Sequence, residues 1–384
     1  EYTMIKILHI VNNLKVNGRT RLLYDLIRLT RADFDHEIIS LLRAGPYEKH
    51  IQYLDVNIFS LHLYGYTNKL KGPYRLLKEI SRIKPDLCLT WSGQGNVLSL
   101  IPRMLGIPVI WTIHNAFKTW DSIFARLWLK LSALLSYFIP YKVVCCSRAS
   151  FNIYAQTHAY CPTKLVLVQN GVDTQRFRPD PQARLNIRSE LQIPLNEFVV
   201  AFPTRLSTGF EGRGQKDPAT FLEAVSIAKK KEPNMRFLMF GPLIRHDNQE
   251  LIDLLQETST LGHVELLGYR DDVNQIFAAS DVIAMSSMDE GLPLALLEAM
   301  ACGAIPVCTQ VAEIPAIVES VGLLVPKKDP VALAGAMIEI ASLDQDKRRS
   351  LSFSAIDRVR RDYNVTSMSK SYAMLIRSAV ARYE

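Results

Sequence analysis

Two glutamates bracket a short apolar segment in the second half of the chain. Glu290 and Glu298 flank the sequence Gly-Leu-Pro-Leu-Ala-Leu-Leu, which follows an apolar run at 282–285. Gly291 would let the backbone approach a ligand closely, and Pro293 suits the first turn of a helix. The free amides of such a helix start favour an anion, for example a diphosphate. One acid would face a reacting group and the other would accept hydrogen bonds from hydroxyls. From the spacing alone, a helix-start acid and a solvated glutamate are the simpler interpretation.

Three further side chains follow apolar runs. Arg205 comes after the run at 198–202, and Lys216 lies one loop later. Two fixed cations in such loops could bind an anion. His114 follows the run at 109–112, and a neutral imidazole there would accept a hydrogen bond from a hydroxyl or shield a cationic centre. Taken alone, these residues are better interpreted as solvated loop cations and a structural histidine.

Short β-type runs alternate with helical patterns along the chain, which is typical of parallel, doubly wound sheets. At 384 residues the chain exceeds what one core normally holds, so two domains are expected. A polar, proline-bearing stretch at 173–197 is interpreted as a linker. The candidate residues follow strands, where ligands bind such sheets. The expected strands are 5–11, 37–41, 86–91, 109–112, 143–146 and 165–168, then 198–202, 236–240, 264–267, 282–285, 305–307 and 322–325.

The charge is unevenly divided. Residues 1–180 carry 23 Lys and Arg against 12 Asp and Glu, a net of +11, while the remainder carries −4 of the overall +7. The first half is therefore expected to meet an anionic surface. No helix-turn-helix, zinc-finger or aromatic-sheet signature indicates nucleic acid. Apolar residues recur at helical spacing over 117–138 beside Lys and Arg. We interpret this segment as a core-facing helix, with a helix lying on an anionic bilayer as the alternative.

Cysteine usage and hydropathy favour a cytoplasmic protein. The six cysteines form no Cys-x-x-Cys pair and are interpreted as reduced, mostly packed thiols. No cleavable leader is evident, and no run reaches the roughly 18 apolar residues of a membrane span. Asp33 and Asp35 have an Asp-x-Asp spacing, but they precede a strand as a polar turn would. No metal site is therefore expected.

Several segments resemble a known family in sequence and order. Residues 290–307 resemble the E-x7-E segment of retaining glycosyltransferases of family 4 (group 1 glycosyl transferases). Residues 166–177 resemble the family's strand and Asn-Gly-Val-Asp turn, and the resemblance covers most of residues 5–345. It implies the GT-B fold, an α/β architecture of two facing doubly wound, Rossmann-like domains with a cleft between them. The expected parts are an acceptor-binding domain over 1–180, a nucleotide-sugar-binding domain over 181–365 and a C-terminal helix over 366–384 that returns to the first domain.

The resemblance implies a role for each matching residue. Glu290 and His114 would lie beside the donor sugar and act in catalysis, and Glu298 would bind the ribose. Arg205, in Thr-Arg-Leu, matches the family's Gly-Arg-Leu, and Lys216 matches the lysine of its Lys-Gly motif; both would contact the diphosphate. The base would be recognised largely by backbone around Tyr269 and Arg270. The backbone that holds the sugar hydroxyls and phosphate would be that of Gly291, Leu292, Pro293 and Leu294.

The chain departs from the family pattern in two loops. Asp217 stands where the family has the glycine after the lysine, and the preceding loop looks longer than usual, so Arg213 competes for the role of Lys216. In the first loop, Asn17 replaces the first residue of a Gly-Gly pair, and Gly18 remains as the donor-side glycine. Asparagine tolerates a left-handed backbone, but its amide narrows the space on the acceptor side.

The resemblance implies transfer of a sugar from a UDP- or GDP-sugar to a hydroxyl acceptor, with retention and without a metal or other cofactor. We expect front-face attack with the donor phosphate as base. The expected setting is synthesis of a cell-envelope polysaccharide, lipopolysaccharide or glycolipid, with peripheral contact at the inner face of the membrane. The alternatives are a nucleotide-sugar-binding protein without turnover and a GT-B nucleotide-sugar epimerase.

Overall fold

The computed structural model describes residues 4–114, 123–206 and 214–383. The chain divides into two compact units, unit 1 of residues 1–171 with 365–384 and unit 2 of residues 172–364. The first division lies at 171 rather than at the predicted 180, because the segment that follows belongs to unit 2. There Val172 pairs with Asn364, and the Arg176 guanidinium donates to the Asp271 carbonyl at 3.0 Å.

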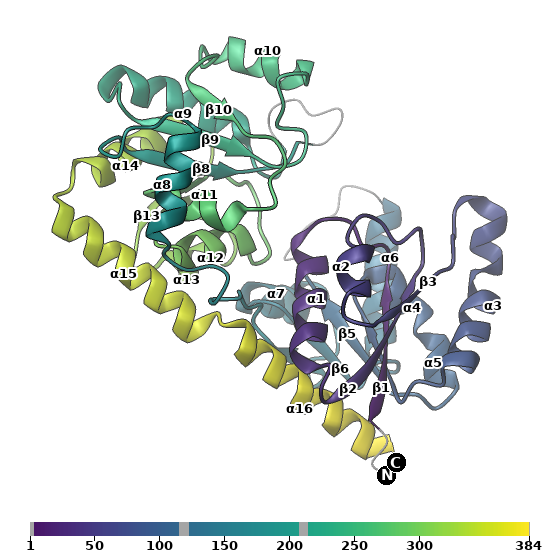
Figure 1. Ribbon diagram of the computed structural model, residues 1–384. Helices are drawn as coiled ribbons and strands as arrows, with labels where there is room; N and C mark the ends of the chain where they lie inside the picture. The colour runs from purple at the N-terminus through teal and green to yellow at the C-terminus, as the bar shows by residue number, and fades with distance from the viewer. Residues whose placement is uncertain (1–3, 115–122, 207–213, 384) are drawn as a thin grey trace. The chain divides into compact units, whose positions relative to one another are not determined.

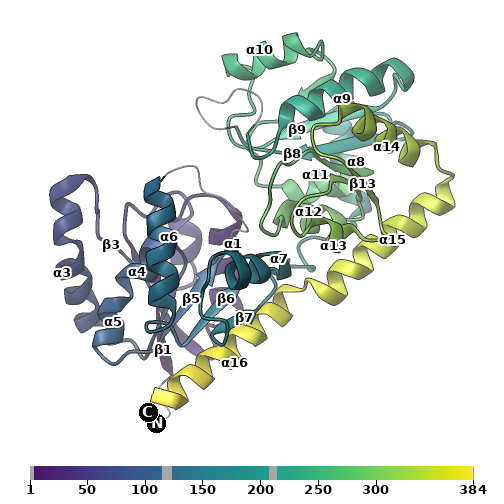
Figure 2. The same cartoon turned by 180° about the vertical axis from the view of Figure 1, so that it is seen from behind.

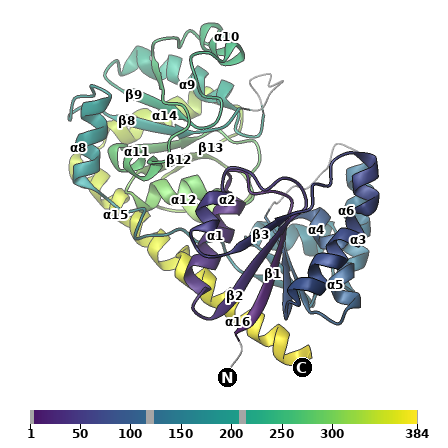
Figure 3. The ribbon, with the colours of Figure 1, turned by 45° about the vertical axis from the view of Figure 1, so that its right-hand side comes forward.

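Unit 1 is built on a parallel sheet with the strand order β3-β2-β1-β4-β5-β6-β7, so the direction of winding reverses between β1 and β4 (Figure 1). Helices α1 and α16 cover one face, and α3, α4, α5 and α6 cover the other (Figure 3). The strands are β1 (Ile5–Val11), β2 (Phe34–Ser40), β3 (Asn57–Ser60), β4 (Leu87–Thr90), β5 (Val109–Ile113), β6 (Lys142–Cys145) and β7 (Leu165–Leu167). The helices are α1 (Gly18–Thr30), α2 (Glu48–Gln52), α3 (Gly65–Ile83), α4 (Gly93–Leu98), α5 (Leu100–Met104), α6 (Ile123–Ser136), α7 (Arg148–Asn152), the π-helix η1 (Ile153–Thr157) and α16 (Val365–Tyr383).

Unit 2 repeats this architecture with the strand order β10-β9-β8-β11-β12-β13, so its winding reverses between β8 and β11. Helix α9 packs with α14, α8 packs with α11, and α12 packs with α15. The strands are β8 (Val199–Pro203), β9 (Arg236–Phe240), β10 (Val264–Leu266), β11 (Val282–Met285), β12 (Ile305–Thr309) and β13 (Leu323–Val325). The helices are α8 (Pro181–Glu190), α9 (Pro218–Lys231), α10 (Gln249–Glu257), α11 (Val273–Ala279), α12 (Leu294–Ala301), α13 (Ile314–Val318), α14 (Pro330–Ser342) and α15 (Gln345–Asp362).

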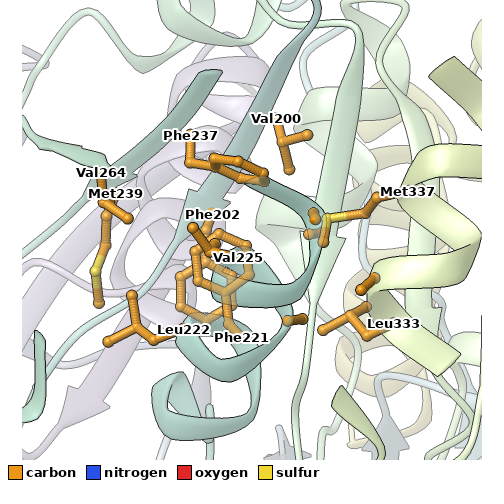
Figure 4. Packing of buried hydrophobic residues seen from close by; sticks show 14 of the residues in the cluster. Val200, Phe202, Phe221, Leu222, Val225, Phe237, Met239, Val264, Leu333 and Met337 are labelled. Carbon is orange, nitrogen blue, oxygen red and sulfur yellow. The ribbon is translucent and has the colours of Figure 1, made fainter. Parts of the chain in front are cut away.

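The core of unit 2 lies between its sheet and helices α9 and α14 (Figure 4). The rings of Phe202 and Phe221 are stacked with centroids 3.9 Å apart and planes 4° apart, and Phe237 meets Phe221 edge-on. Leu333 and Met337 of α14 are also fully buried in this cluster. This packing fixes β8 and α9, the two elements that flank the loop carrying Arg205 and Lys216.

The stretch at 173–197 is not a simple linker, because it contains α8. The Asp180 carboxylate caps this helix by accepting from the Ala183 amide at 2.9 Å, and Pro181 occupies the first turn. Arg188 is fully buried and donates to Asp281 at 2.9 Å and to the Ala279 carbonyl at 3.1 Å. The proline and polar residues that suggested a linker are therefore a helix start and a buried ion pair.

Candidate functional site

The loops after β8 and β11 leave unit 2 at the point where its winding reverses. In open α/β sheets, ligands bind outside the carboxyl ends of the strands at this point. The two loops are joined by hydrogen bonds: the Met288 amide donates to the Gln215 carbonyl at 2.8 Å. The Ser286 hydroxyl lies 2.9 Å from the Lys216 carbonyl and 2.7 Å from that of Asp217. The segments that carry Lys216 and Glu290 are thus held against each other.

Glu290 is a buried acid at this edge, with 5% of its surface exposed. Its Oε1 accepts from Lys216 Nζ at 2.6 Å and from the Ser287 hydroxyl at 2.7 Å. The Thr309 hydroxyl in turn donates to the Ser287 carbonyl at 2.7 Å. An ammonium group has three donors, so Lys216 can bind Glu290 and a further anion together. Sequence reasoning missed Ser287, although its position three residues before Glu290 could have indicated a short-range contact.

Helix α12 begins directly after this acid. Pro293 is its N-cap (φ −76°, ψ 100°), so it precedes the first turn rather than lying within it as predicted. Gly291 is half-buried, Leu292 is buried, and Leu294 is the first helical residue. Glu298 lies in the same helix with 8% of its surface exposed. The amides at the start of α12 therefore lie a few residues from Glu290, at the end of the sheet where anions bind.

The loop after β8 carries the two predicted cations in different settings. Arg205 is exposed, whereas the Lys216 side chain is 20% exposed and ion-paired. Arg213, the competing candidate, lies outside the described residues. Asp217 has a left-handed backbone (φ 43°, ψ 60°) and caps α9 through Thr220, whose hydroxyl donates to the carboxylate at 2.7 Å. A glycine adopts this conformation without strain, and aspartate is among the few residues that tolerate it.

The predicted base-recognition segment lies after β10. Tyr269 is 50% exposed, and its hydroxyl donates to Asp271 at 2.8 Å. Arg270 donates to Glu190 at 2.6 Å and to Asp272 at 2.7 Å. Its hydrogen bonds to Asp272 and then to Glu190 raise the pKa of Arg270 above its ordinary value. The Arg270 side chain thus ties this loop to α8.

Unit 1 places a second set of predicted residues where its own winding reverses. Asn17 has an extended backbone (φ −161°) and does not adopt the left-handed conformation that asparagine would tolerate at this position. Its side-chain oxygen caps α1 by accepting from the Thr20 amide at 3.0 Å, which fixes the amide that was expected to narrow the acceptor side. Gly18 is the exposed first residue of α1. Arg19 reaches across to donate to the Trp91 carbonyl after β4, at 3.0 Å.

His114 follows β5 in the same unit. Its ring stacks on Trp91, with centroids 5.2 Å apart and planes 5° apart, and its Nε2 lies 2.9 Å from the Thr112 hydroxyl. Burial, with a smaller contribution from the nearby Arg19 charge, lowers the pKa of His114 to about 3. The imidazole is therefore neutral at pH 7. Sequence reasoning missed Trp91, because its only signal is its place directly after a strand.

Helix α6 lies beside α4 in unit 1 (Figure 2). The preferred interpretation of a core-facing helix holds for Leu129 and Leu135, which pack against the core, but most of the other described apolar residues of α6 are exposed. Ser132, Ala133 and Ser136 are buried on the opposite side, where small side chains allow close packing. The part of the predicted stripe at 117–122 lies outside the described residues. The exposed side chains and their exposed fractions are Leu127 (58%), Trp128 (41%), Leu131 (41%), Leu134 (60%), Tyr137 (48%) and Phe138 (69%).

The remaining expectations concern metals, thiols and membrane spans. Asp33 pairs with Arg377 at 3.1 Å and Asp35 with Lys6 at 3.4 Å. Among the described residues, no group of three or more His, Cys, Asp or Glu side chains could hold a metal ion. The six cysteines are free and buried. In the part of the chain that the structure describes, no helix is long and apolar enough to cross a membrane.

Comparison with known proteins identifies the family. The model of "Glycosyltransferase Family 4" matches residues 16–176, and the model of "Glycosyl transferases group 1" matches residues 200–342. The chain is a family 4 glycosyltransferase. The first match falls mostly in unit 1 and the second in unit 2. The two family models of this glycosyltransferase therefore include the candidate residues of both units.

Relatives with curated names are also glycosyltransferases. An Escherichia coli protein named UDP-Gal:alpha-D-GlcNAc-diphosphoundecaprenol alpha-1,3-galactosyltransferase is 27% identical over 318 residues, which are 79% of this chain and 78% of that protein. The D-inositol 3-phosphate glycosyltransferase of Saccharomonospora viridis is 32% identical over 212 residues, 52% of this chain and 47% of its own length. The match to this family 4 enzyme thus spans about half the length of the second relative.

Solved structures share the fold of this glycosyltransferase. Anabaena HepE in complex with UDP-glucose superposes with a TM-score of 0.84 at 19% identity, covering 97% of this chain and 100% of that one. A sucrose-phosphate synthase from Thermosynechococcus elongatus gives a TM-score of 0.77 at 18% identity, covering 98% of this chain and 100% of that one. Both similarities support the GT-B fold, the two-sheet α/β architecture predicted from the sequence.

Proposed function

We propose that this enzyme transfers a sugar from a nucleoside diphosphate sugar to a hydroxyl of a lipid-linked or glycan acceptor, with retention of configuration. The observation that carries the proposal is the Lys216–Glu290 ion pair, at 2.6 Å, beside the start of α12 in unit 2. A cation and helix amides suit the diphosphate, and a carboxylate suits the sugar that becomes electron-poor as its bond breaks. An ion pair that only stabilised the fold would have no reason to lie where the winding of the sheet reverses, between β8 and β11.

The chain's own groups can neutralise the leaving diphosphate in this proposal. Lys216 and Arg205 flank the loop after β8, and the start of α12 adds amides and a favourable dipole. Unit 2 would also hold the ribose at Glu298 and the base along the backbone near Tyr269. We therefore propose that transfer needs no metal. Chelation with EDTA would leave the rate of such an enzyme unchanged.

Retention is proposed to follow from attack on the face of the leaving group. The bond from the anomeric carbon to the phosphate oxygen breaks, and the acceptor oxygen bonds to the same face of that carbon. The departing phosphate takes the acceptor's proton, so charge and atoms balance without an enzyme base. His114 would accept a hydrogen bond from a donor-sugar hydroxyl, and Glu290 would lie beside the electron-poor carbon.

The comparisons support UDP as the donor nucleotide and a lipid-linked acceptor. The name of the Escherichia coli relative contains a UDP-galactose donor and a diphosphoundecaprenol acceptor, and HepE was solved with UDP-glucose. The proposed setting is synthesis of a cell-envelope polysaccharide or glycolipid. A GDP-sugar donor is the competing outcome of the test that follows.

A ligand screen followed by product analysis tests this function. We expect UDP or GDP, and one of their sugars, to raise the melting temperature, because a ligand at 100 times its Kd stabilises the folded state by about 2.7 kcal/mol. The responding sugar would then be transferred to a lipid-linked acceptor in EDTA, and NMR of the product would show the donor's anomeric configuration. No response to any of these compounds would contradict the proposal. Binding without transfer would favour a binding protein, and conversion of the donor without acceptor would favour an epimerase.

We also propose that unit 1 attaches to the inner face of an anionic membrane through the outward face of α6. This face consists of Leu127, Trp128, Leu131 and Leu134, and the exposed Phe138 follows just after the helix ends at Ser136. Cations gather at the end of the helix: Lys164 Nζ donates to the Tyr137 carbonyl at 2.7 Å. Burial and then the charges of Arg103, Arg382 and Lys142 lower the pKa of Lys164. An apolar strip beside clustered cations is the pattern of interfacial helices.

Vesicle binding tests this attachment. We expect the protein to sediment with phosphatidylglycerol vesicles at low salt and to be released at high salt. Leu134→Glu should weaken binding about tenfold or more, because a buried leucine contributes about 1.5–3 kcal/mol. Leu185→Glu is the matched control, since Leu185 is 46% exposed on α8 of unit 2 and should not matter. Failure of the wild-type protein to bind these vesicles at low salt would contradict the proposed attachment of unit 1 to a membrane.

A further inference from the structure

The tautomer of His114 is fixed by its hydrogen bonds. The Thr112 hydroxyl donates its single hydrogen to the Thr90 carbonyl at 2.8 Å, and a carbonyl can only accept. Thr112 therefore offers His114 only a lone pair, so the proton of the neutral imidazole lies on Nε2, 2.9 Å away. The other nitrogen, Nδ1, then carries a lone pair. This atom is buried and has no hydrogen-bond partner among the described residues.

Trp91 holds the plane of that imidazole. Its indole is 1% exposed and lies parallel to the His114 ring, with the planes 5° apart. On α16, Tyr372 also stacks on Trp91, with centroids 6.2 Å apart. The Trp91 carbonyl accepts from Arg19, which fixes the backbone after β4. The indole therefore supports the plane in which the His114 ring lies.

A buried chain of hydrogen bonds fixes the indole in turn. The indole N–H can only donate, and it donates to His9 Nδ1 at 3.1 Å. His9 must then donate from Nε2 to His36 Nδ1 at 2.9 Å, and His36 Nε2 donates to the Thr30 hydroxyl at 3.1 Å. Thr30 completes the chain by donating to the Leu26 carbonyl at 2.6 Å. The direction of every hydrogen bond in this chain is set, because the indole N–H at its start can only donate and the Leu26 carbonyl at its end can only accept.

We propose that Trp91 is a positioning residue that holds His114 in the Nε2–H tautomer, with Nδ1 presented as a hydrogen-bond acceptor for a hydroxyl of the donor sugar. This inference rests on the proposed function. In this tautomer His114 offers the sugar an acceptor, because its one ring hydrogen is donated to Thr112, so His114 does not protonate the leaving group. The group that it recognises must carry a hydrogen, which a hydroxyl has and a phosphate oxygen or carbonyl lacks.

Two measurements test the inference, and the first needs no ligand. Long-range ¹H–¹⁵N NMR of protein labelled with ¹⁵N-histidine reports which ring nitrogen carries the proton. We expect His114 to be neutral with its proton on Nε2 at pH 7 in the wild type, and to lose this single tautomer in Trp91→Leu. Trp91→Phe is the matched control, because it keeps an aromatic face against His114. A wild-type His114 that is cationic or protonated at Nδ1 would overturn the proposal whatever the enzyme's substrate.

The second measurement separates the sugar from the nucleotide. Trp91→Leu should lower kcat about tenfold or more while the Kd for the nucleoside diphosphate changes by less than about twofold, and Trp91→Phe should recover most of that loss. A variant damaged only in folding would instead lose binding sites for the nucleotide and kcat together. Equal kcat in Trp91→Leu and wild type would overturn the positioning role. A wild-type protein that binds no nucleotide contradicts the proposed function, and the tautomer measurement still decides the role of Trp91.

Discussion

Replacing Glu290 with glutamine is expected to lower kcat for sugar transfer by about 100- to 1000-fold, the effect of removing one preorganised electrostatic contact from a transition state. The amide keeps the size of the side chain but loses the charge that pairs with Lys216 at 2.6 Å. The same charge would stabilise the electron-poor sugar carbon. Initial rates at saturating donor, together with the Kd for the nucleoside diphosphate, measure the effect.

Two variants serve as controls for this result. Ser287→Ala removes one hydrogen bond to the Glu290 carboxylate but keeps the charge of Glu290 and its pair with Lys216, so it should lower kcat less than Glu290→Gln does. Asp346→Asn changes an acid whose side chain is 96% exposed in the first turn of α15, and should retain near wild-type kcat. Full turnover by Glu290→Gln would remove Glu290 from the centre of the mechanism.

Replacing Gly241 with alanine is expected to lower the free energy of unfolding by about 3–5 kcal/mol, from backbone strain and overpacking together. Gly241 follows β9 with φ +136°, and an added Cβ would lie 1.8 Å from the Thr204 carbonyl oxygen. Thr204 is the residue before Arg205. If the chain relieves the clash by moving Thr204, the Kd for the nucleoside diphosphate should rise as well. Urea unfolding and nucleotide titration measure the two effects.

Gly262 is the matched control for this variant. Its φ is +82°, but an added Cβ would meet nothing within 4 Å. Gly262→Ala should therefore cost only the left-handed backbone penalty of about 1–2 kcal/mol. If the free energy of unfolding fell equally in the two variants, the close approach between Gly241 and Thr204 would not contribute to the loss.

Local patterns predicted most strands of the fold but missed features that depend on the surroundings. Strand β3 (Asn57–Ser60) escaped prediction because it is a short edge strand whose side chains are only partly buried or exposed. The apolar stripe of α6 was found, but periodicity does not say which face meets the core: Leu135 packs against it beside the buried Ser132 and Ser136, whereas Leu127 and Leu134 are exposed. Such cases require knowledge of the neighbouring elements.

The sequence predicted which residues belong to the candidate site, but not which side chains contact one another there. The family motif singled out Glu290, and the spacing predicted that a helix begins after it, one residue from where α12 starts. The partners of Glu290 and His114 could not be predicted in the same way. Lys216 is separated from Glu290 by 74 positions in the chain, and the pairing depends on the order in which β8 and β11 meet. Trp91 reaches His114 through the neighbouring strands β4 and β5.

The return of α16 to unit 1 has a consequence for synthesis on the ribosome. Residues 365–384 supply part of the packing of unit 1, including Tyr372, which stacks on Trp91. Domains generally fold as they emerge, with the N-terminal one first. Here the first 171 residues emerge without their last helix, while all of unit 2 emerges before it. Unit 2 can therefore finish folding before unit 1, and the surface of α1 that receives α16 stays open until residues 365–384 have emerged.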